Sequence, residues 1–188
     1  MSGTERASGW AVARRLVLML LAALTWGALL GCVWEAVWVP PAGAAFEGTW
    51  YLAPGGLGQD VAGTAWFAVI GLAGGLGYGV VSAALSKDRE VLTLVAVVVG
   101  AVLASWVMFH VGHALGPADP QALAADAGDY EAIPSDLGLA GAGDRPWPFW
   151  FDSSAFNAFP AGALLGLMGV FLGGPRRTRE RPRTESGS

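Results

Sequence analysis

Four apolar runs, each about 20 residues long or longer and free of charged side chains, dominate this chain and restrict how it can fold. An α-helix rises about 1.5 Å per residue, so roughly 20 apolar residues cross the hydrocarbon core of a bilayer. Charged residues make up only 14% of the chain, whereas about a quarter is usual in soluble domains. We therefore predict an all-α, polytopic membrane protein with four antiparallel transmembrane helices, at about residues 14–38, 61–85, 91–115 and 153–174.

The basic residues determine the predicted orientation. Ten of the 11 Lys and Arg residues fall before the first run, between the second and third, or after the fourth. They are Arg6, Arg14, Arg15, Lys87, Arg89, Arg176, Arg177, Arg179, Arg181 and Arg183. Short basic segments stay in the cytoplasm during membrane insertion. We therefore expect a multi-pass protein of the cell (plasma) membrane with both termini cytoplasmic, and the Ala-, Gly- and Arg-rich composition points to a bacterial source with a GC-rich genome.

The acidic residues show the opposite distribution. The segments expected inside carry ten basic and five acidic residues, a balance of +5, and those expected outside carry ten acids and only Arg145, a balance of −9. The outer acids are Glu35, Glu47, Asp60, Asp119, Asp126, Asp129, Glu131, Asp136, Asp144 and Asp152. Topology alone accounts for this asymmetry. Two further interpretations stay open: an outer surface that attracts cations, and an inner tail that holds anionic lipid headgroups.

Two connections and one tail complete the predicted organisation. The first outer connection, about residues 40–60, contains three aromatic residues and then a glycine-rich turn, so we expect an irregular segment at the membrane surface. The second, residues 117–147, is an acidic extracytoplasmic loop in which residues 121–125 suit a short surface helix. The rest of that loop lacks periodicity and is expected to be mobile. Residues 175–188 form a basic cytoplasmic tail that is expected to be disordered.

Glycines recur four residues apart within the predicted helices. The series are Gly71, Gly75 and Gly79 in the second helix, Gly162 and Gly166, then Gly169 and Gly173, in the fourth, and Gly27 and Gly31 in the first. Four residues are about one turn, so each series forms a groove on one face into which another helix can pack closely. We expect packing within the chain, with homo-oligomerisation through one groove, or a glycine-lined pore, as alternatives.

His110 and His113 form the candidate ligand or proton site. They lie three residues apart near the outer end of the third run, so their side chains share a face of the helix. Ionisable groups at this depth are rare and often functional. Two histidines can hold a metal or a haem iron, or relay a proton. The candidate helpers, all near the same outer level, are Glu35, Asp60, Asp152 and Asn157. The alternative is that both rings only form hydrogen bonds at the membrane interface, and the metal question stays open.

Motifs for enzymatic chemistry are absent from the sequence. It contains no phosphate-binding loop, no nucleophile elbow and no His-Glu-x-x-His helix. The single cysteine, Cys32, permits no intrachain disulfide. Leu29-Leu30-Gly31-Cys32 resembles a lipoprotein cleavage box, but apart from Glu35 the chain stays apolar through Val39, so a buried thiol is favoured over lipidation. From these absences we expect no enzymatic activity and no cofactor. We also expect no nucleic-acid partner, because the Arg-rich tail suits a membrane anchor.

The chain resembles a family of small actinobacterial four-pass membrane proteins that is known only as a domain of unknown function. The likeness rests on Trp26-Gly27, on Asp60 with Ala65-Trp66-Phe67, on Gly112-His113-Ala114-Leu115-Gly116-Pro117 and on Pro146-Trp147-Pro148, and it covers roughly residues 15–172. The resemblance implies a four-pass envelope and brings no reaction, cofactor or catalytic residue.

Three hypotheses for function follow. The leading one is a non-enzymatic scaffold or accessory subunit that presents an aromatic and acidic face outside the cell. Its partners are the lipid bilayer and either another membrane protein or a second copy of itself. The second is a small transport or ion-handling protein that uses the histidine pair. The third is a membrane carrier that binds haem or a metal through the same two side chains.

Overall fold

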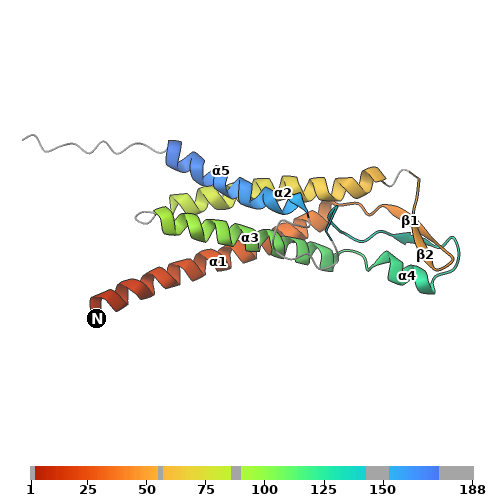
Figure 1. The fold of residues 1–188 in the computed structure, drawn as a ribbon, viewed down its shortest axis with the longest axis horizontal. Coiled ribbons are helices and arrows are strands. Elements are labelled where there is room, and N and C mark those ends of the chain that lie inside the picture. Colours follow the sequence, from red (N-terminus) through yellow and green to blue (C-terminus); the bar gives the residue numbers. More distant parts are fainter. Residues whose placement is uncertain (1–2, 55–56, 86–89, 143–152, 174–188) are drawn as a thin grey trace, which may run out of the picture.

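The computed structural model describes residues 3–54, 57–85, 90–142 and 153–173. Four of its helices are long and apolar enough to cross a membrane, which confirms the predicted fold class. They are α1 (Gly3–Val37), α2 (Leu57–Ala84), α3 (Glu90–Leu115) and α5 (Ala158–Gly173), and the 3-10 turn η1 (Ser154–Asn157) leads into α5. The four helices run alternately in opposite directions, so α1 begins and α5 ends at the same end of the bundle (Figure 1). We call this the terminal end.

The bundle consists of two close helix pairs, α1 with α3 and α2 with α5. In the second pair the glycines interlock. A Cβ atom built on Gly75 or Gly79 would overlap the backbone of α5, and one built on Gly162 or Gly166 would overlap the backbone of α2. Gly71 is less crowded, because its nearest neighbour would lie 3.5 Å from such an atom. Lipid tails give apolar helices no reason to associate, so close backbone contact of this kind supplies the attraction.

The α1–α3 pair uses glycine in the same way. A Cβ on Gly27 would overlap the backbone of Ala104, and one on Gly31 would lie 2.6 Å from the carbonyl oxygen of Met108. Gly169 and Gly173 have the same spacing but would meet no atom within 4 Å. The four-residue spacing therefore marks helix contacts on α1, α2 and the first half of α5, and bilayer-facing positions on the last turns of α5.

The helix α1 starts well before the predicted boundary, at Gly3 rather than near residue 14. Its first turns extend away from the rest of the bundle (Figure 1), and it is the least buried of the four spanning helices. Cys32 is exposed on α1, so the expected buried thiol is wrong. The neighbouring Gly31 faces α3, and because successive residues on a helix point in different directions, Cys32 faces away from it.

The core of the bundle has two parts. Toward the terminal end it is built mainly from small side chains, namely Ala23, Ala83, Ala101, Ala104 and Ala163, with Val97, Tyr78, Phe159 and Leu167. At the opposite end it is aromatic and contains Trp34, Trp38, Phe67, Phe109 and Phe156. The rings of Trp34, Phe67, Phe109 and Phe156 pack edge to face or tilted against one another. The indole Nε1 of Trp34, which is fully buried, donates a 2.8 Å hydrogen bond to the carbonyl oxygen of Gly63. This bond joins α1 to α2 where the side chains are largest.

The two connections that were expected to be irregular and mobile instead form one small sheet. β1 (Ala42–Phe46) pairs antiparallel with β2 (Thr49–Leu52) and, on its other side, with β3 (Ala132–Pro134). The helix predicted near residues 121–125 is present as α4 (Pro120–Asp126). Both strands of the hairpin are short. β1 is mostly Ala and Gly and has low β-propensity, whereas β2 (Thr-Trp-Tyr-Leu) is rich in residues that favour strands. We call residues 40–53 and 117–142 the cap.

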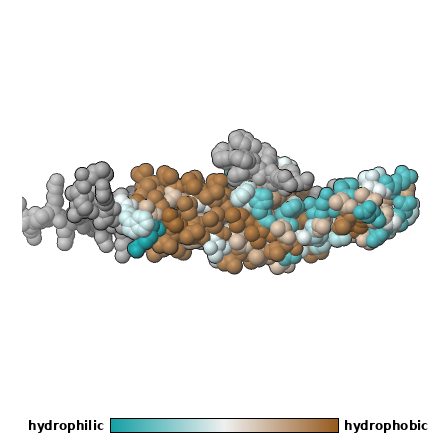
Figure 2. All heavy atoms as spheres, turned by 90° about the horizontal axis from the view of Figure 1, so that it is seen from below, coloured by the Kyte–Doolittle hydropathy of each residue, from teal (hydrophilic) through white to brown (hydrophobic). Residues whose placement is uncertain are grey.

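The surface follows the same division (Figure 2). An apolar band covers the helices, and hydrophilic residues gather over the cap, which extends beyond the bundle at one end. The band fits the bilayer and the cap fits water, as expected for a protein whose spanning segments have apolar outer faces. The Pro146-Trp147-Pro148 segment and the basic tail at 175–188 lie outside the described residues.

Candidate functional site

The tip of the cap is a two-residue hairpin turn between β1 and β2. Glu47 and Gly48 have φ angles of 50° and 70°, which is the left-handed pair of a type I′ turn. Gly48 adopts this conformation freely, whereas a non-glycine residue is strained there by about 1–2 kcal/mol. The carboxylate of Asp129 accepts a 2.9 Å hydrogen bond from the backbone N–H of Glu47. Tyr130, also at positive φ (65°), places its ring 5.5 Å from that of Phe46. Strained positions of this kind persist only where neighbouring contacts hold them, and they cluster at functional sites.

A small apolar core of its own holds the cap together. Ala45, Ala124 and Ile133 are buried against one another, with the Trp50 ring packed beside them. The Trp50 indole donates a 3.0 Å hydrogen bond to the carbonyl oxygen of Ile133. Gly43 lies under that ring, where a Cβ atom would overlap it. The cap is therefore a folded unit with specific packing, which a mobile loop would lack.

The helix α4 packs against all three strands of the sheet. Asp119 caps it by accepting a 2.9 Å hydrogen bond from the backbone N–H of Gln121, and Pro120 occupies its first position. The Gln121 amide then reaches Trp50 on β2, accepting from its backbone N–H at 3.3 Å and donating to its carbonyl at 3.4 Å. Open strand edges recruit other chains. Gln121 therefore occupies backbone groups that would otherwise be available for such pairing.

Residues 137–140 fasten the cap to the bundle. Leu137 and Leu139 are buried in the aromatic part of the core. Thr64 on α2 accepts a 2.8 Å hydrogen bond from the backbone N–H of Ala140, and the Nδ1 atom of His113 on α3 lies 2.7 Å from the carbonyl oxygen of Leu137. These contacts come from two helices and the strand-containing loop, so the orientation of the cap is coupled to the bundle.

The charge of the cap is its clearest chemical property. Its residues, 40–53 and 117–142, contain six acidic side chains and no Lys or Arg. The acids are Glu47, Asp119, Asp126, Asp129, Glu131 and Asp136. Three of them also accept hydrogen bonds from backbone N–H groups of the cap. Asp119 caps α4, Asp129 binds the hairpin turn, and Glu131 accepts a 3.1 Å hydrogen bond from the N–H of Gly128. All except Asp136 are exposed, so their charge faces water.

Two of these acids border a recess between α4 and β3. Asp126 and Glu131 line it together with Leu123 and Ile133, and its volume is about 290 Å³. The recess combines carboxylates at its rim with apolar side chains. Such a combination suits a cationic side chain with an aliphatic stem, because Lys and Arg bury their stems and keep the charged head in a polar setting.

The histidine pair has a different environment from the cap surface. The ring of His113 is stacked on Phe109 at 5.6 Å, with an angle of 8°, and is held by Leu137. His110 packs edge to face with Trp106 at 4.4 Å and with Phe109 at 5.3 Å. Its Nε2 atom is buried and has no hydrogen-bond partner among the described residues. The structure thus brings both rings onto Phe109, and among the described residues it shows a polar contact for the ring of His113 and none for the Nε2 atom of His110.

The proposed helpers of the histidine pair are not joined to it by any described contact. Asp60 lies in the first turns of α2, and its side chain, like Asp152 as a whole, lies outside what the structure describes. Within the described part of the chain, no three His, Cys, Asp or Glu side chains lie close enough to hold a metal ion. The observed chemistry at His113 is a backbone contact, which stabilises the junction between α3 and the cap.

Sequence reasoning missed the residues that build the cap. Asp119-Pro120 is a recognisable signal for a helix start, because Asp is a favoured N-cap and Pro a favoured first residue. Gln121 and Asp129 carry no comparable signal, since their partners lie 71 and 82 residues away in the chain.

Comparison of this chain with protein-family models, with curated proteins and with solved structures gives no match. Its function is therefore inferred from the geometry alone.

Proposed function

We propose that this protein is a non-enzymatic scaffold or accessory subunit of the cell membrane, with both termini in the cytoplasm and the cap outside. The cap is offered as the docking surface for a basic segment of a partner protein. The observation that carries this proposal is the composition of the cap: six acids and no Lys or Arg on an ordered sheet and helix. An acidic field of this kind attracts basic partners and speeds their association.

The shape of the cap supports a protein partner over a free cation. The recess beside Asp126 and Glu131 is lined by apolar as well as acidic groups. Exposed aromatic side chains, which are enriched among residues that dominate binding energy, lie on the same cap: Tyr130 is 78% exposed and Tyr51 is 56% exposed. A simple ion would use only the carboxylates. A basic peptide or loop would use the charges, the recess and the rings together.

Capture from native membranes in a mild detergent tests the proposal. The tagged protein should recover a partner whose binding weakens as salt increases, because exposed charge pairs are screened. The double variant Asp126→Asn, Glu131→Gln keeps the size of both side chains and leaves a carbonyl oxygen at each position, so it should lose most of that partner. Glu185→Gln, at the other end of the chain, makes the same kind of charge change and should retain it. Recovery of nothing but the protein itself, or equal recovery with the double variant, would contradict the proposal.

One observation favours a second candidate, the handling of protons or small ions near His110. Its Nε2 atom is buried without a described partner, and a polar atom left unpaired in this way costs about 1–3 kcal/mol. Reconstituted vesicles with a pH-sensitive dye inside would reveal a flux. The variant His110→Phe should abolish that flux while His113→Asn retains it. A wild-type protein that leaves the vesicles as tight as protein-free ones removes this candidate.

A further inference from the structure

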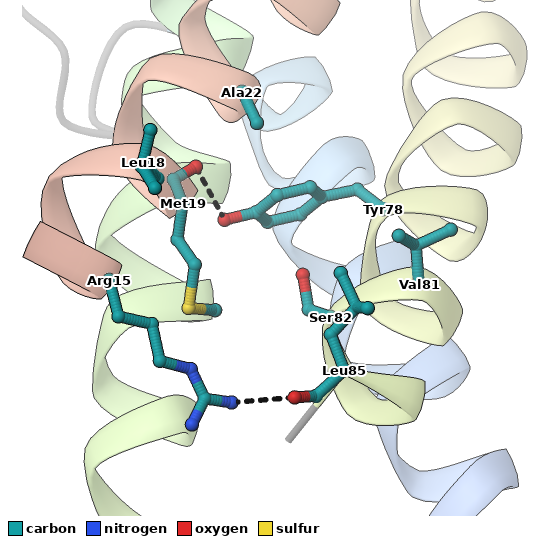
Figure 3. Close-up of a pocket in the computed structure, with 8 residues that line it drawn as sticks. All are labelled: Arg15, Leu18, Met19, Ala22, Tyr78, Val81, Ser82 and Leu85. Carbon is teal, nitrogen blue, oxygen red and sulfur yellow. Dashed lines mark hydrogen bonds between the residues drawn. The ribbon is translucent and has the colours of Figure 1, made fainter. Parts of the chain in front are cut away.

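A groove separates α1 from α2 in the half of the bundle near the terminal end (Figure 3). The part of the groove nearest the terminal end has a volume of about 270 Å³. It is lined by Arg15, Leu18, Met19, Ala22, Tyr78, Val81, Ser82 and Leu85. A second recess of about 290 Å³ continues it toward Trp26 and Gly77, and Ala22, Tyr78 and Val81 border both. The lining is almost entirely apolar, with one basic side chain at the end nearest the terminal end of the bundle.

Hydrogen bonds between described residues of α1 and α2 cross the groove at three levels. The Trp26 indole donates to the carbonyl oxygen of Gly74 at 3.1 Å. The Tyr78 ring extends from α2 toward α1, where its hydroxyl donates to the carbonyl oxygen of Met19 at 3.5 Å (Figure 3). Arg15 reaches the other way and donates to the carbonyl oxygen of Leu85 at 2.9 Å (Figure 3). The two helices are therefore held together across a gap that their side chains leave unfilled.

The dimensions of the groove select the kind of molecule that fits it. From Arg15 to Trp26 the groove follows 11 residues of α1, which at about 1.5 Å per residue is roughly 16 Å. This is about half of the ~30 Å hydrocarbon core, that is, one leaflet. A transmembrane helix is about 10–12 Å wide with its side chains, so it could enter between α1 and α2 only if the bridging bonds broke. A single flexible hydrocarbon chain needs no such change.

The charge at the mouth selects the headgroup. The Arg15 guanidinium carries five N–H donors in a planar fork, the geometry that matches a phosphate group. Among the residues that line the groove, Arg15 is the basic one. Basic pockets between transmembrane helices on the cytoplasmic side bind the headgroups of anionic lipids. With the proposed orientation, this end of the groove lies in the cytoplasmic leaflet.

We propose that this groove binds one acyl chain of an anionic phospholipid, with the lipid phosphate on Arg15 and the chain running along Tyr78 toward Trp26. The site is separate from the cap and does not depend on the docking function proposed above. The lipid would fill the space that the α1–α2 pair leaves open and would hold α1 against the bundle. Because lipid tails gain little by moving from bilayer to groove, the headgroup charge supplies the selectivity.

Titration of the purified full-length protein in detergent, followed by native mass spectrometry, tests the site. The two probes are dioleoylphosphatidylglycerol and dioleoylphosphatidylcholine, which share acyl chains and differ in headgroup charge. We expect one tightly held phosphatidylglycerol, favoured over phosphatidylcholine by about fivefold, because one basic group near an anionic headgroup is worth about 1 kcal/mol. Arg15→Gln should remove this preference. Arg14→Gln, the same charge change at a residue that does not line the groove, should keep most of it.

A second pair of variants tests the hydrocarbon part without changing charge. A Cβ on Gly77 would meet no atom within 4 Å, so Gly77→Leu should fill the groove without disturbing the helix contacts. It should reduce binding of both lipids at least fivefold. Gly169 faces equally open space on α5, and Gly169→Leu should leave binding unchanged. Equal affinity of the wild type for the two lipids, an unchanged preference in Arg15→Gln, full binding by Gly77→Leu, or dimers in place of lipid adducts would each overturn the proposal.

Discussion

The interlocked glycines of α2 and α5 make a sharp prediction about stability. A Cβ atom added at Gly162 would lie 2.9 Å from the backbone nitrogen of Leu76 and 3.0 Å from the carbonyl carbon of Leu72, besides overlapping the oxygen of Leu72. Carbon atoms settle about 3.5–4.0 Å apart. Because the crowded atoms belong to the backbone, a side-chain rotation cannot relieve the overlap. The variant Gly162→Ala must therefore move the two helices apart by at least about 0.5–1 Å at this crossing.

The cost of that movement can be estimated from the contacts it stretches. A gap of about 0.5–1 Å forfeits a quarter to a half of each contact, and each contact is worth about 0.1–0.2 kcal/mol. If the crossing involves about as many contacts as one buried leucine, roughly 50 atom pairs, a quarter of their energy is about 2 kcal/mol. This lies within the ~1–3 kcal/mol typical of overpacked interiors. We expect Gly162→Ala to lower the free energy of unfolding by about this amount.

Unfolding in mixed micelles of a mild detergent and sodium dodecyl sulfate, followed by tryptophan fluorescence, measures the effect. Gly169→Ala is the matched control, because it makes the same change on the same helix where a Cβ meets no atom within 4 Å. It should be neutral, or stabilising by up to about 1 kcal/mol through helix propensity. Gly71→Ala should also be mild, since its nearest neighbour would lie at an ordinary 3.5 Å. Equal losses for Gly162→Ala and Gly169→Ala would refute the packing argument.

Three further predictions concern the cap and the histidines. His113→Ala removes the 2.7 Å contact with Leu137 and should speed amide hydrogen exchange around residues 137–140 about fivefold, as expected for a hydrogen bond worth about 1 kcal/mol; unchanged exchange would contradict the junction described here. His110→Phe replaces a buried unpartnered Nε2 by carbon and should be neutral or stabilising in the unfolding assay, whereas a loss of more than 1 kcal/mol would indicate a missed partner. Gly43→Val pushes a side chain into the Trp50 ring and should make the cap sensitive to brief proteolysis while the spanning helices stay protected; a resistant cap would show that the ring has another place to go.

The transmembrane helices were readable from the sequence because bilayer insertion imposes a simple rule. About 20 apolar residues without charge must form a helix, since no other segment satisfies its backbone in hydrocarbon. The same rule gives no information about how each helix is rotated about its own axis. A helix that is apolar on every side has no face that its sequence marks. Gly162 and Gly169 therefore look alike in the sequence, although a Cβ atom on Gly162 would overlap α2 and one on Gly169 would meet no atom within 4 Å.

The pairing of β1 with β3 could not be read from the sequence, for a different reason. β1 reads Ala-Gly-Ala-Ala-Phe and lacks the β-branched residues that mark strands. It is stabilised by β3, which begins 86 residues after the end of β1, and by the Trp50 ring packed over Gly43. Contacts between residues so far apart leave no local pattern. The groove beside Arg15 and Tyr78 could not be predicted from the sequence for the same reason, because its lining residues come from two helices that are far apart in the chain.

The orientation of the chain is the claim on which the acidic docking surface and the cytoplasmic lipid site both rest. Labelling of single cysteines in intact cells with a membrane-impermeant maleimide tests it most directly, in a Cys32→Ala background that removes the one native thiol. Glu47→Cys, at the exposed tip of the cap, should react in intact cells, and Ser188→Cys should react only after the membrane is opened. Labelling of the terminal cysteine in intact cells, with Glu47→Cys protected until permeabilisation, would show that the cap faces the cytoplasm and would contradict the account.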